Sequence, residues 1–394
     1  MKYYAYKSDG GNIAVDDTIL VKDMEATAGS KMLTGFKPLF SAEAVTRLEN
    51  KGYKVAGKTN VGEFGLDLVG EFSYYGEADD TLRGAAAELV AKGEVEAALG
   101  VDMNGATRRA AAISAVDFLK PTYGTVSRYG VISCAASGEQ LGVYAKSAQG
   151  IKTVMEIIGG HDPKDGTGVS NDSYDYSITT VTGKKVAIIK ELVDKADDDT
   201  KAKIKAYAEA LTAQGVTVEE ISCDIFETAN VAWQILMTAE TCNNVSRYDG
   251  VKFGHRASEY KNIDELYVNS RTEGFNFLTK AVILYGSDVL SKNRYADCYD
   301  KSLKVRRVIA DKLAKLMESY DAIFHLVSAG KGLQEFYQLE SNEARIETAD
   351  EAAMLDDKIL ECWEKHPRHT IINNAVDFDS KMREVVSQIT LYLK

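Results

Sequence analysis

The chain has 394 residues, of which 45% are hydrophobic and 27% charged, a composition typical of a globular protein with a substantial core. Lysine and arginine number 47 against 59 aspartates and glutamates, which gives a net charge of −12. Phosphate binding depends on clustered cations, so this balance argues against direct nucleic-acid binding.

The cysteines and the amino end indicate a cytoplasmic protein. The five cysteines show no CxxC spacing, and no long apolar run follows the first residues. We therefore expect reduced thiols, no signal peptide, no membrane span and no cofactor. Cys362, His366 and His369 resemble a metal cluster, but Pro367 interrupts them and a fourth ligand is missing, so we expect no metal site.

The first elements alternate between strands and helices. Residues 19–23 have the apolar pattern of a strand, and Ser41 is a suitable cap for a helix to about Asn50. Residues 53–56 read as a second strand. Residues 52–59, GYKVAGKT, match the letters of a phosphate-binding loop with Lys58 as its lysine. We reject that reading, because the residues between the glycines are themselves the strand.

The stretch that organises the chain runs from Gly93 to Gly130. Asn104, Gly105 and Ala106 lie between two alanine-rich segments, where small side chains allow the backbone to approach a ligand closely. The turn contains no serine, cysteine or threonine. Thr107 supplies the nearest hydroxyl, so the turn suits carbonyl chemistry but lacks a nucleophile.

Further elements follow in order. Ser147 begins a helix that ends at Gly159, and a strand, helix and strand at 185–190, 198–215 and 216–222 predict a β-α-β unit. Residues 226–319 are predicted to be almost wholly helical. The last part reads as a strand at 322–327, a helix at 348–365, a strand at 370–373 and a helix at 377–393.

About residues 15–320 resemble the amidase-signature family, in the form found in the glutamine-hydrolysing A subunit of glutamyl-tRNA(Gln) amidotransferase. The motifs are KPTYGTVSRYG, TAGSKMLTGFKPLF and ETCNNVSRYDGVKFGHRASEY. The resemblance implies an α/β fold with a mixed central sheet flanked by helices, truncated relative to the family and closed by a C-terminal β-α-β-α segment. We expect an amidase-like domain at 1–320 and a segment at 321–394 that packs on the same sheet.

The family uses a relay from a lysine through a bridging serine to a nucleophilic serine. Matching the motifs places Ala106 on the nucleophile, Leu82 on the bridging serine beside Arg83, and Lys22, from VKDM, on the lysine. A later run whose arginine holds the substrate carboxylate is replaced by Ala281 and Val282. Only one member of the relay is retained, so the resemblance implies a catalytically inactive site.

The remaining residues of the loop form a candidate ligand pocket. Arg108 and Arg83, with Asn104, Gly105 and Thr107, can make a cationic pocket where the serines are missing; the alternative is ordinary surface or structural pairing of the arginines. His255 has no serine or cysteine beside it and reads as structural.

About 75 residues at the C-terminal end resemble instead the tail of predicted AAA-type P-loop ATPases related to small-molecule kinases. The signals are YDAIFHLV, LDDKILECWEKHP and IINNAVDFDSKM. The phosphate loop of that family has no counterpart here. The segment can add two strands to the sheet but cannot by itself hold a triphosphate.

The leading hypothesis is an inactive amidase-like protein with a binding, scaffold or assembly role, as a homo-oligomer or with a partner like the other subunits of the amidotransferase. One alternative keeps an active amidase or amidotransferase component with Thr107 or Cys134 as an altered nucleophile. Another is nucleotide binding through the C-terminal segment.

Overall fold

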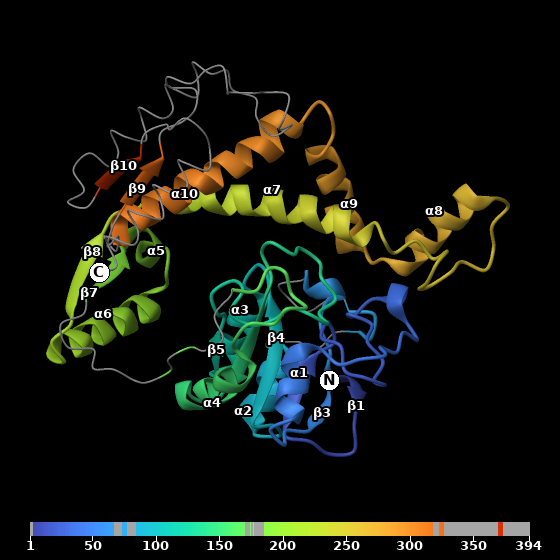
Figure 1. The fold of residues 1–394 in the computed structure, drawn as a ribbon, viewed down its shortest axis with the longest axis horizontal. Coiled ribbons are helices and arrows are strands. Elements are labelled where there is room, and N and C mark those ends of the chain that lie inside the picture. Colours follow the sequence, from blue (N-terminus) through green and yellow to red (C-terminus); the bar gives the residue numbers. More distant parts are fainter. Residues whose placement is uncertain are drawn as a thin grey trace. The chain divides into compact units, whose positions relative to one another are not determined.

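The structure is a computed structural model that describes residues 3–66, 73–76, 84–169, 174, 176, 185–317, 323–326 and 369–372 (Figure 1). The chain divides into two compact units, residues 1–309 and 310–394. The division falls within a helix, α10, and each unit is described by itself below.

The main sheet of the first unit has six strands in the order β1-β3-β2-β4-β6-β5. Strand β2 runs parallel to β3 and β4, whereas β1, β5 and β6 pair antiparallel with their neighbours. The predicted mixed sheet is therefore confirmed. The strands are β1 (Tyr4–Lys7), β2 (Ile13–Asp16), β3 (Val55–Thr59), β4 (Ala97–Asp102), β5 (Asp117–Leu119) and β6 (Gln140–Ala145).

Helices cover both faces of this sheet. On one face, α1 (Glu43–Glu49) and α4 (Ala148–Ile158) pack on a core that includes Ile13 and Val15 of β2. On the other, α2 (Ala85–Lys92) and α3 (Ala106–Ser114) pack on a core that includes Ala14. Side chains alternate along a strand, so Asp16 lies on the α2–α3 face with Ala14.

The local predictions for this unit were largely correct, with two errors. Helix α1 begins at Glu43 and its N-cap is Ala42, without a side-chain hydrogen bond, so Ser41 does not cap it as predicted. The Ser147 hydroxyl accepts a hydrogen bond from the Gly150 N–H and caps α4, as the sequence indicates. The predicted strand at 19–23 is wrong, because the strand is β2 at Ile13–Asp16 and Ile19 makes only an isolated bridge to Val131. Ile19 is fully buried in a loop, which explains why its apolar letters resembled a strand.

A second, two-stranded sheet confirms the predicted β-α-β unit. Strands β7 (Lys185–Ile189) and β8 (Thr217–Ile221) are parallel, and α5 (Lys190–Asp194) and α6 (Asp198–Ala213) connect them. The helical part then contains α7 (Phe226–Val245), α8 (Ile263–Gly274), α9 (Phe277–Val289), a π-helix, η3 (Tyr295–Asp300), and α10 (Lys301–Met317). None of the described helices is long and apolar enough to cross a membrane.

Two strands are described in the second unit. Strand β9 (Ile323–Leu326) pairs in parallel with β10 (His369–Ile372), close to the predicted positions. Among the described strands these two pair with each other. The expected packing of this segment on the main sheet stays a prediction. The predicted helices at 348–365 and 377–393 lie outside the described residues.

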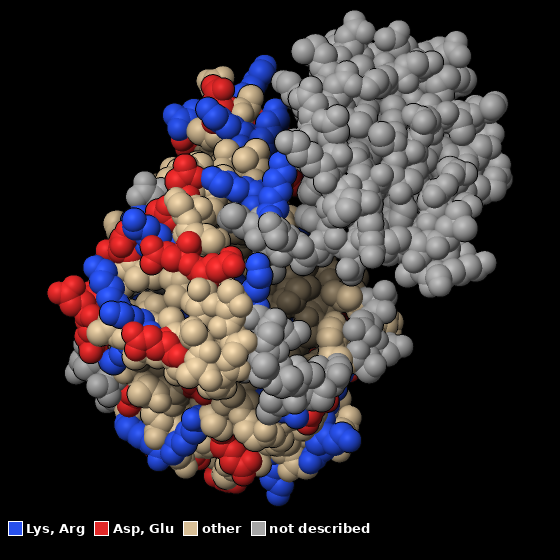
Figure 2. Space-filling model, turned by 90° about the vertical axis from the view of Figure 1, so that its left-hand side faces the viewer, with Lys and Arg blue, Asp and Glu red and all other residues tan. Residues whose placement is uncertain are grey.

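The described part of one face of the molecule carries both signs of charge, interspersed (Figure 2). A nucleic-acid interface requires cations gathered on one surface, and this face does not have that arrangement.

Candidate functional site

The candidate site lies where β4 ends and α3 begins. Gly105 has a φ of +100°, a backbone conformation that side chains rarely adopt, and it directly precedes the first residue of α3, Ala106. Asn104 donates from Nδ2 to the Leu66 carbonyl at 3.3 Å, and its Oδ1 is buried without a hydrogen-bond partner among the described residues. The turn is therefore held on one side, and Ala106 is partly exposed.

Asp102, at the last position of β4, fixes this turn. Its Oδ1 accepts from the Gly105 N–H at 3.1 Å and from Lys120 Nζ at 3.2 Å, and its side chain pairs with Arg108 at 3.1 Å and accepts from the Thr107 hydroxyl. Burial opposes ionisation, but hydrogen bonds from Arg108 and Thr107 and the charge of Lys120 outweigh it and lower the pKa of Asp102 to about 2. Asp102 is thus a permanent anion that orients the turn.

This arrangement leaves no activated hydroxyl at the turn. The side chain at the start of α3 is the methyl group of Ala106, and the adjacent Thr107 hydroxyl is committed to Asp102. An anion with so low a pKa is a poor general base for that hydroxyl. Of the candidate cations, Arg108 pairs with Asp102 and is half-exposed, while Leu82 and Arg83 lie outside the described residues.

The structure brings Asn104, Gly105, Ala106, Thr107 and Arg108 together, but not Lys22. Lys22 is exposed, and its backbone N–H donates to the Ser41 hydroxyl at 3.0 Å, in the loop after β2. No described contact joins its side chain to the turn.

Asp16 of β2 lies on the sheet face that carries α3, beside the end of β4. Its Oδ2 accepts from the Val101 N–H of β4 at 3.1 Å, and its Oδ1 accepts from the Thr59 hydroxyl of β3 at 2.9 Å. A Cβ at Gly100 would lie 2.9 Å from Asp16 Oδ2 and 3.3 Å from the Thr107 methyl carbon, so the carboxylate and the first turn of α3 are neighbours. Burial raises the pKa of Asp16 to about 6. Sequence reasoning missed this residue, although VDDT, which contains it, resembles the VKDM motif.

Lys58 has a structural position. It lies in β3, fully buried, and its Nζ is 3.4 Å from Asp17 Oδ1 and donates to the Asp17 carbonyl at 3.2 Å. The strand runs through the residues that match the phosphate-loop pattern, and the lysine has a carboxylate partner. The rejection of a phosphate loop here is confirmed.

Cys134 and His255 also have structural surroundings. Burial raises the pKa of the Cys134 thiol to about 12, and its Sγ is 3.5 Å from the Thr241 hydroxyl. Because the thiolate is the reactive form, this thiol is not an activated nucleophile. His255 lies 2.7 Å from Glu273, and its backbone N–H bonds to the Met32 carbonyl at 2.7 Å, which supports the structural reading.

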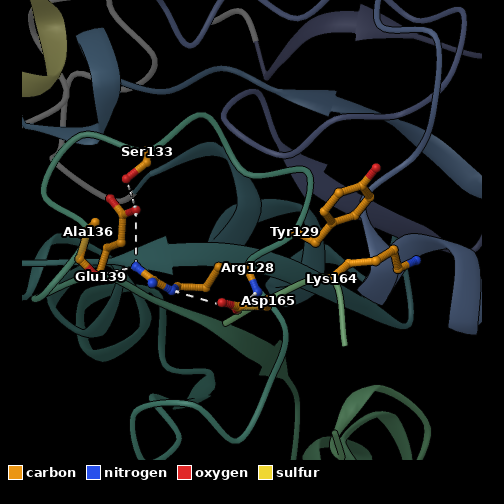
Figure 3. Close-up of a pocket in the computed structure, with 7 residues that line it drawn as sticks. All are labelled: Arg128, Tyr129, Ser133, Ala136, Glu139, Lys164 and Asp165. Carbon is orange, nitrogen blue, oxygen red and sulfur yellow. Dashed lines mark hydrogen bonds and ion pairs between the residues drawn. The ribbon is translucent and has the colours of Figure 1, made fainter. Parts of the chain in front are cut away.

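A second pocket, of about 250 Å³, lies beside the segment that contains Cys134 (Figure 3). Arg128 pairs with Glu139 at 3.7 Å and donates to the Thr167 hydroxyl at 2.8 Å. Glu139 accepts the Cys134 and Ala135 N–H groups at 3.0 and 3.1 Å. Arg128 and Glu139 thus use most of their polar atoms in contacts within the protein, and we interpret the pocket as a structural network.

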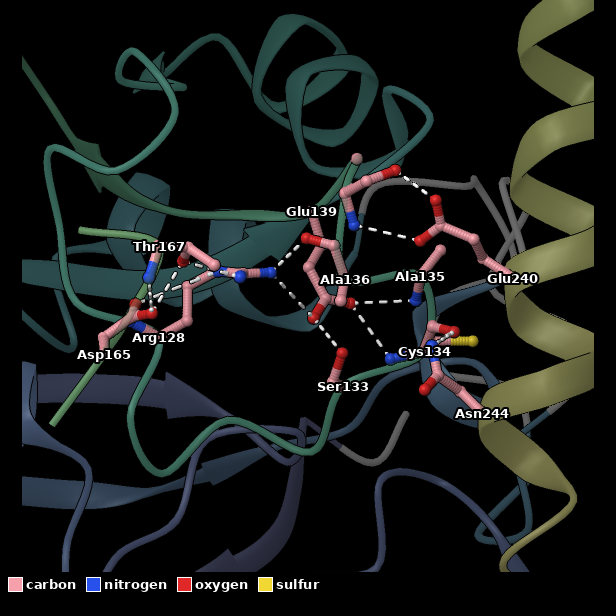
Figure 4. A network of polar contacts seen from close by, with 12 residues as sticks. Arg128, Ser133, Cys134, Ala135, Ala136, Glu139, Asp165, Thr167, Glu240 and Asn244 are labelled. Atoms are coloured by element: carbon pink, nitrogen blue, oxygen red, sulfur yellow. Dashed lines mark hydrogen bonds and ion pairs between the residues drawn. The ribbon is translucent and has the colours of Figure 1, made fainter. Parts of the chain in front are cut away.

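The same network ties this segment to the long helix α7 (Figure 4). Glu240 accepts the Ser137 N–H at 3.0 Å, and Asn244 donates to the Cys134 carbonyl at 2.9 Å. Lys120 joins the segment to the turn, because its Nζ reaches the Met103 carbonyl at 3.4 Å and the Gly138 carbonyl at 3.3 Å. Lys120 was missed from the sequence, although it opens the motif KPTYGTVSRYG.

The positions expected to replace the substrate-binding arginines lie on α9. Ala281 is exposed and Val282 is partly exposed. The described part of the chain has no group of three or more histidines, cysteines, aspartates or glutamates suited to a metal ion. Cys362 and His366 lie outside that part.

A mixed sheet between two helical layers, with a glycine turn that opens a helix at the end of a central strand, defines an amidase-type α/β protein. The chain belongs to the amidase family, whose profile matches residues 9–334. It is 36% identical over 327 residues to the A subunit of glutamyl-tRNA(Gln) amidotransferase from Lachnoclostridium phytofermentans, covering 80% of this chain and 66% of that protein. The corresponding protein of Sulfurisphaera tokodaii is 33% identical over 326 residues, covering 80% and 69%.

The solved structures agree on the fold. The structure of the A subunit of this amidotransferase from Thermotoga maritima superposes with a TM-score of 0.65 at 26% identity and covers 82% of this chain and 71% of that one. A native peptide amidase from Stenotrophomonas maltophilia, at 23% identity, has a TM-score of 0.61 and covers 77% and 65%. The resemblance of the C-terminal segment to P-loop ATPases remains a prediction.

Proposed function

We propose that this amidase-family chain does not hydrolyse amides by a serine relay and that it acts in binding or assembly. The observation that carries the proposal is the methyl group of Ala106 at the start of α3, where the family's motif has its nucleophile. A methyl group cannot attack a carbonyl, and the Thr107 hydroxyl is held by Asp102.

The position of Asp16 supports the proposal further. In the motif VKDN the lysine must reach the turn at the start of α3, and Asp16 of VDDT is the residue of β2 whose carboxylate lies on that face, beside Gly100 and Val101 of β4. We infer that VDDT, and not VKDM, corresponds to the motif, with a carboxylate in place of the amine. All three members of the relay are then replaced: the amine by Asp16, the bridging hydroxyl by Leu82 and the nucleophile by Ala106.

The assembly role rests on the relatives. Three of the similar proteins named above are A subunits of an amidotransferase, and we propose a related partner subunit or a second copy of the chain as the partner. The chain spans 66% of the length of the Lachnoclostridium phytofermentans relative, so its partners need not be the same.

The direct test measures ammonia release from glutamine and asparagine by the purified chain, with an amidase that carries the complete relay as positive control. We expect no release above buffer. Turnover near the common enzyme range of about 10 s⁻¹ refutes the proposal.

A variant test distinguishes loss of the relay from loss of the nucleophile alone. Ala106→Ser restores only the attacking hydroxyl, so we expect this variant to remain inactive. Ammonia release by Ala106→Ser, absent from the unmodified chain, contradicts the assignment of Asp16 and Leu82.

A further inference from the structure

The helices α8 and α9 leave an apolar surface exposed on the first unit. Helix α9 packs on α7 through Gly286, where a Cβ would lie 2.4 Å from the Thr238 carbonyl (Figure 1). Its opposite side carries Phe277, Ala281 and Leu284, with Phe277 76% and Leu284 72% exposed. Positions separated by four and three residues form one stripe along a helix. Contiguous exposed apolar surface marks protein-binding sites, and this stripe is a candidate for one.

A pocket of about 210 Å³ lies beside this stripe and places positively charged side chains next to it. It is lined by Arg271 and Thr272 from the end of α8, by Phe275, and by Lys280, Ile283 and Leu284 of α9. Among these described residues two are cations and none has a carboxylate. Glu273, the nearest acid along the chain, lies 2.7 Å from His255 Nε2. Glu63 and Asp249 interact electrostatically with Lys280 and Arg271, respectively, but neither lines the pocket.

Arg271 retains donors for a ligand. Its Nη1 donates to the Tyr248 carbonyl at 2.7 Å and to the Val245 carbonyl at 3.2 Å, where α7 ends. No described residue accepts a bond from its Nε or Nη2. Lys280 donates to the Thr272 carbonyl at 2.8 Å, and an ammonium group has three donors. A chain with a net charge of −12 thus presents a local cationic pocket on an apolar surface.

The stripe on α9 and the pocket at the end of α8 together form what we call the α8–α9 groove. We propose that this groove is the docking site of an amphipathic helix from a partner protein, with a carboxylate beside its apolar residues. Apolar side chains of the partner at positions i, i+4 and i+7 pack along Phe277, Ala281 and Leu284, which is the usual way that a helix binds in a groove. The carboxylate enters the pocket between Arg271 and Lys280. The inference rests on the proposed assembly role.

The test uses two synthetic helical peptides of about 16 residues, long enough for measurable helicity. Both carry leucines at i, i+4 and i+7. One peptide has glutamates beside the leucines, and the other has lysines at the same positions. Fluorescence anisotropy with the full chain should show the glutamate peptide binding at least about tenfold more tightly. Equal affinity for the two peptides, or no binding of either, overturns the proposal.

Variants locate the binding. Leu284→Glu should abolish it, and Lys280→Glu should reverse the preference in favour of the lysine peptide. Leu39→Glu is the matched control, because Leu39 is 86% exposed on another surface, and this variant should bind as the unmodified chain does. Circular dichroism confirms that each variant is folded. Unchanged binding by Leu284→Glu overturns the proposal.

Light scattering tests whether a second copy of the chain, instead of a partner protein, occupies the groove. If the unmodified chain is a dimer that Leu284→Glu converts to a monomer, the groove binds a second copy and the acidic partner is refuted. Failure of peptide binding does not affect the proposed lack of hydrolysis, and ammonia release in the assay above does not affect the groove, so the two proposals fail separately.

Discussion

Replacing Lys58 by methionine tests the energetic role of the buried ion pair between Lys58 of β3 and Asp17, the residue that follows β2. The two side chains are 0% and 1% exposed, and Lys58 Nζ lies 3.4 Å from Asp17 Oδ1. Methionine fills most of the same volume but has no charge. Asp17 keeps the Thr27 and Gly29 N–H groups at 3.0 and 3.2 Å and the Thr27 hydroxyl. Its hydrogen bonds therefore survive while its counter-charge is lost.

In the folded variant Asp17 can stay charged without a partner or become protonated, and the two responses cost similar free energies at pH 7. Leaving one member of a buried pair charged and unpaired costs about 3–5 kcal/mol. Protonating a carboxyl with an ordinary pKa of about 3.9 at pH 7 costs about 4 kcal/mol. We therefore expect Lys58→Met to lower the free energy of unfolding of the first unit by about 3–4 kcal/mol at pH 7.

The pH dependence tests the cause. Burial raises the pKa of Asp17, and removing Lys58 removes the charge that opposes this rise. The folded variant then binds more protons than the unfolded chain, so its stability recovers as the pH falls, by up to about 1.4 kcal/mol per pH unit above pH 4. The difference in the free energy of unfolding between the variant and the unmodified chain should therefore decrease as the pH falls.

Urea unfolding measures the free energies, and amide hydrogen exchange at β2 and β3 assigns them to the first unit. Asp17→Asn combined with Lys58→Met should recover most of the loss, because no buried charge remains. Lys51→Met, at an exposed lysine, is the control and should change stability by less than about 0.5 kcal/mol. A loss below about 1 kcal/mol, or a double variant as unstable as the single one, refutes the reasoning.

Three further outcomes are expected. Burial raises the pKa of the Cys134 thiol to about 12, so iodoacetamide should leave it unmodified in the folded chain, and rapid labelling found by peptide mass spectrometry contradicts this. Gly100→Ala should lower the melting temperature, since the added Cβ would lie 2.8 Å from the Tyr144 ring and 2.9 Å from Asp16; an unchanged value rejects that packing. The lowered pKa of Asp102, about 2, stabilises the folded state above about pH 4 and this contribution is lost as the pH falls toward 2, so Asp102→Asn should flatten that part of an acid-unfolding profile.

Local signals made much of the fold accessible from the sequence. Ser147 caps α4, and the strand, helix and strand at 185–222 form the predicted parallel unit, because a cap and an amphipathic period act over a few residues. Sheet membership depends on long-range pairing. The sequence predicted β9 and β10 near their positions, and their parallel pairing with each other became visible only in the structure.

The sequence also could not show which side chains of α9 are exposed. The letters TKAVILYG in α9 indicated lost arginines, but they could not show which side of the helix packs on α7. Gly286 and Val289 are buried there, whereas Leu284 is 72% exposed. The groove beside α8 therefore became visible only from the structure.

The assignment of the relay lysine shows why strand register must decide between similar motifs. VDDT and VKDM both place an ionisable residue after a valine, and only VKDM retains the lysine, so the letters favour Lys22. In the sheet, Val15 pairs with Leu99 of β4 and points into the α1–α4 core, which directs Asp16 toward α3. Lys22 follows after the chain has left the strand, where its side chain is exposed. A proton relay needs hydrogen-bond reach, so under the proposed assignment an amine would have to stand at position 16, and the residue there is an aspartate.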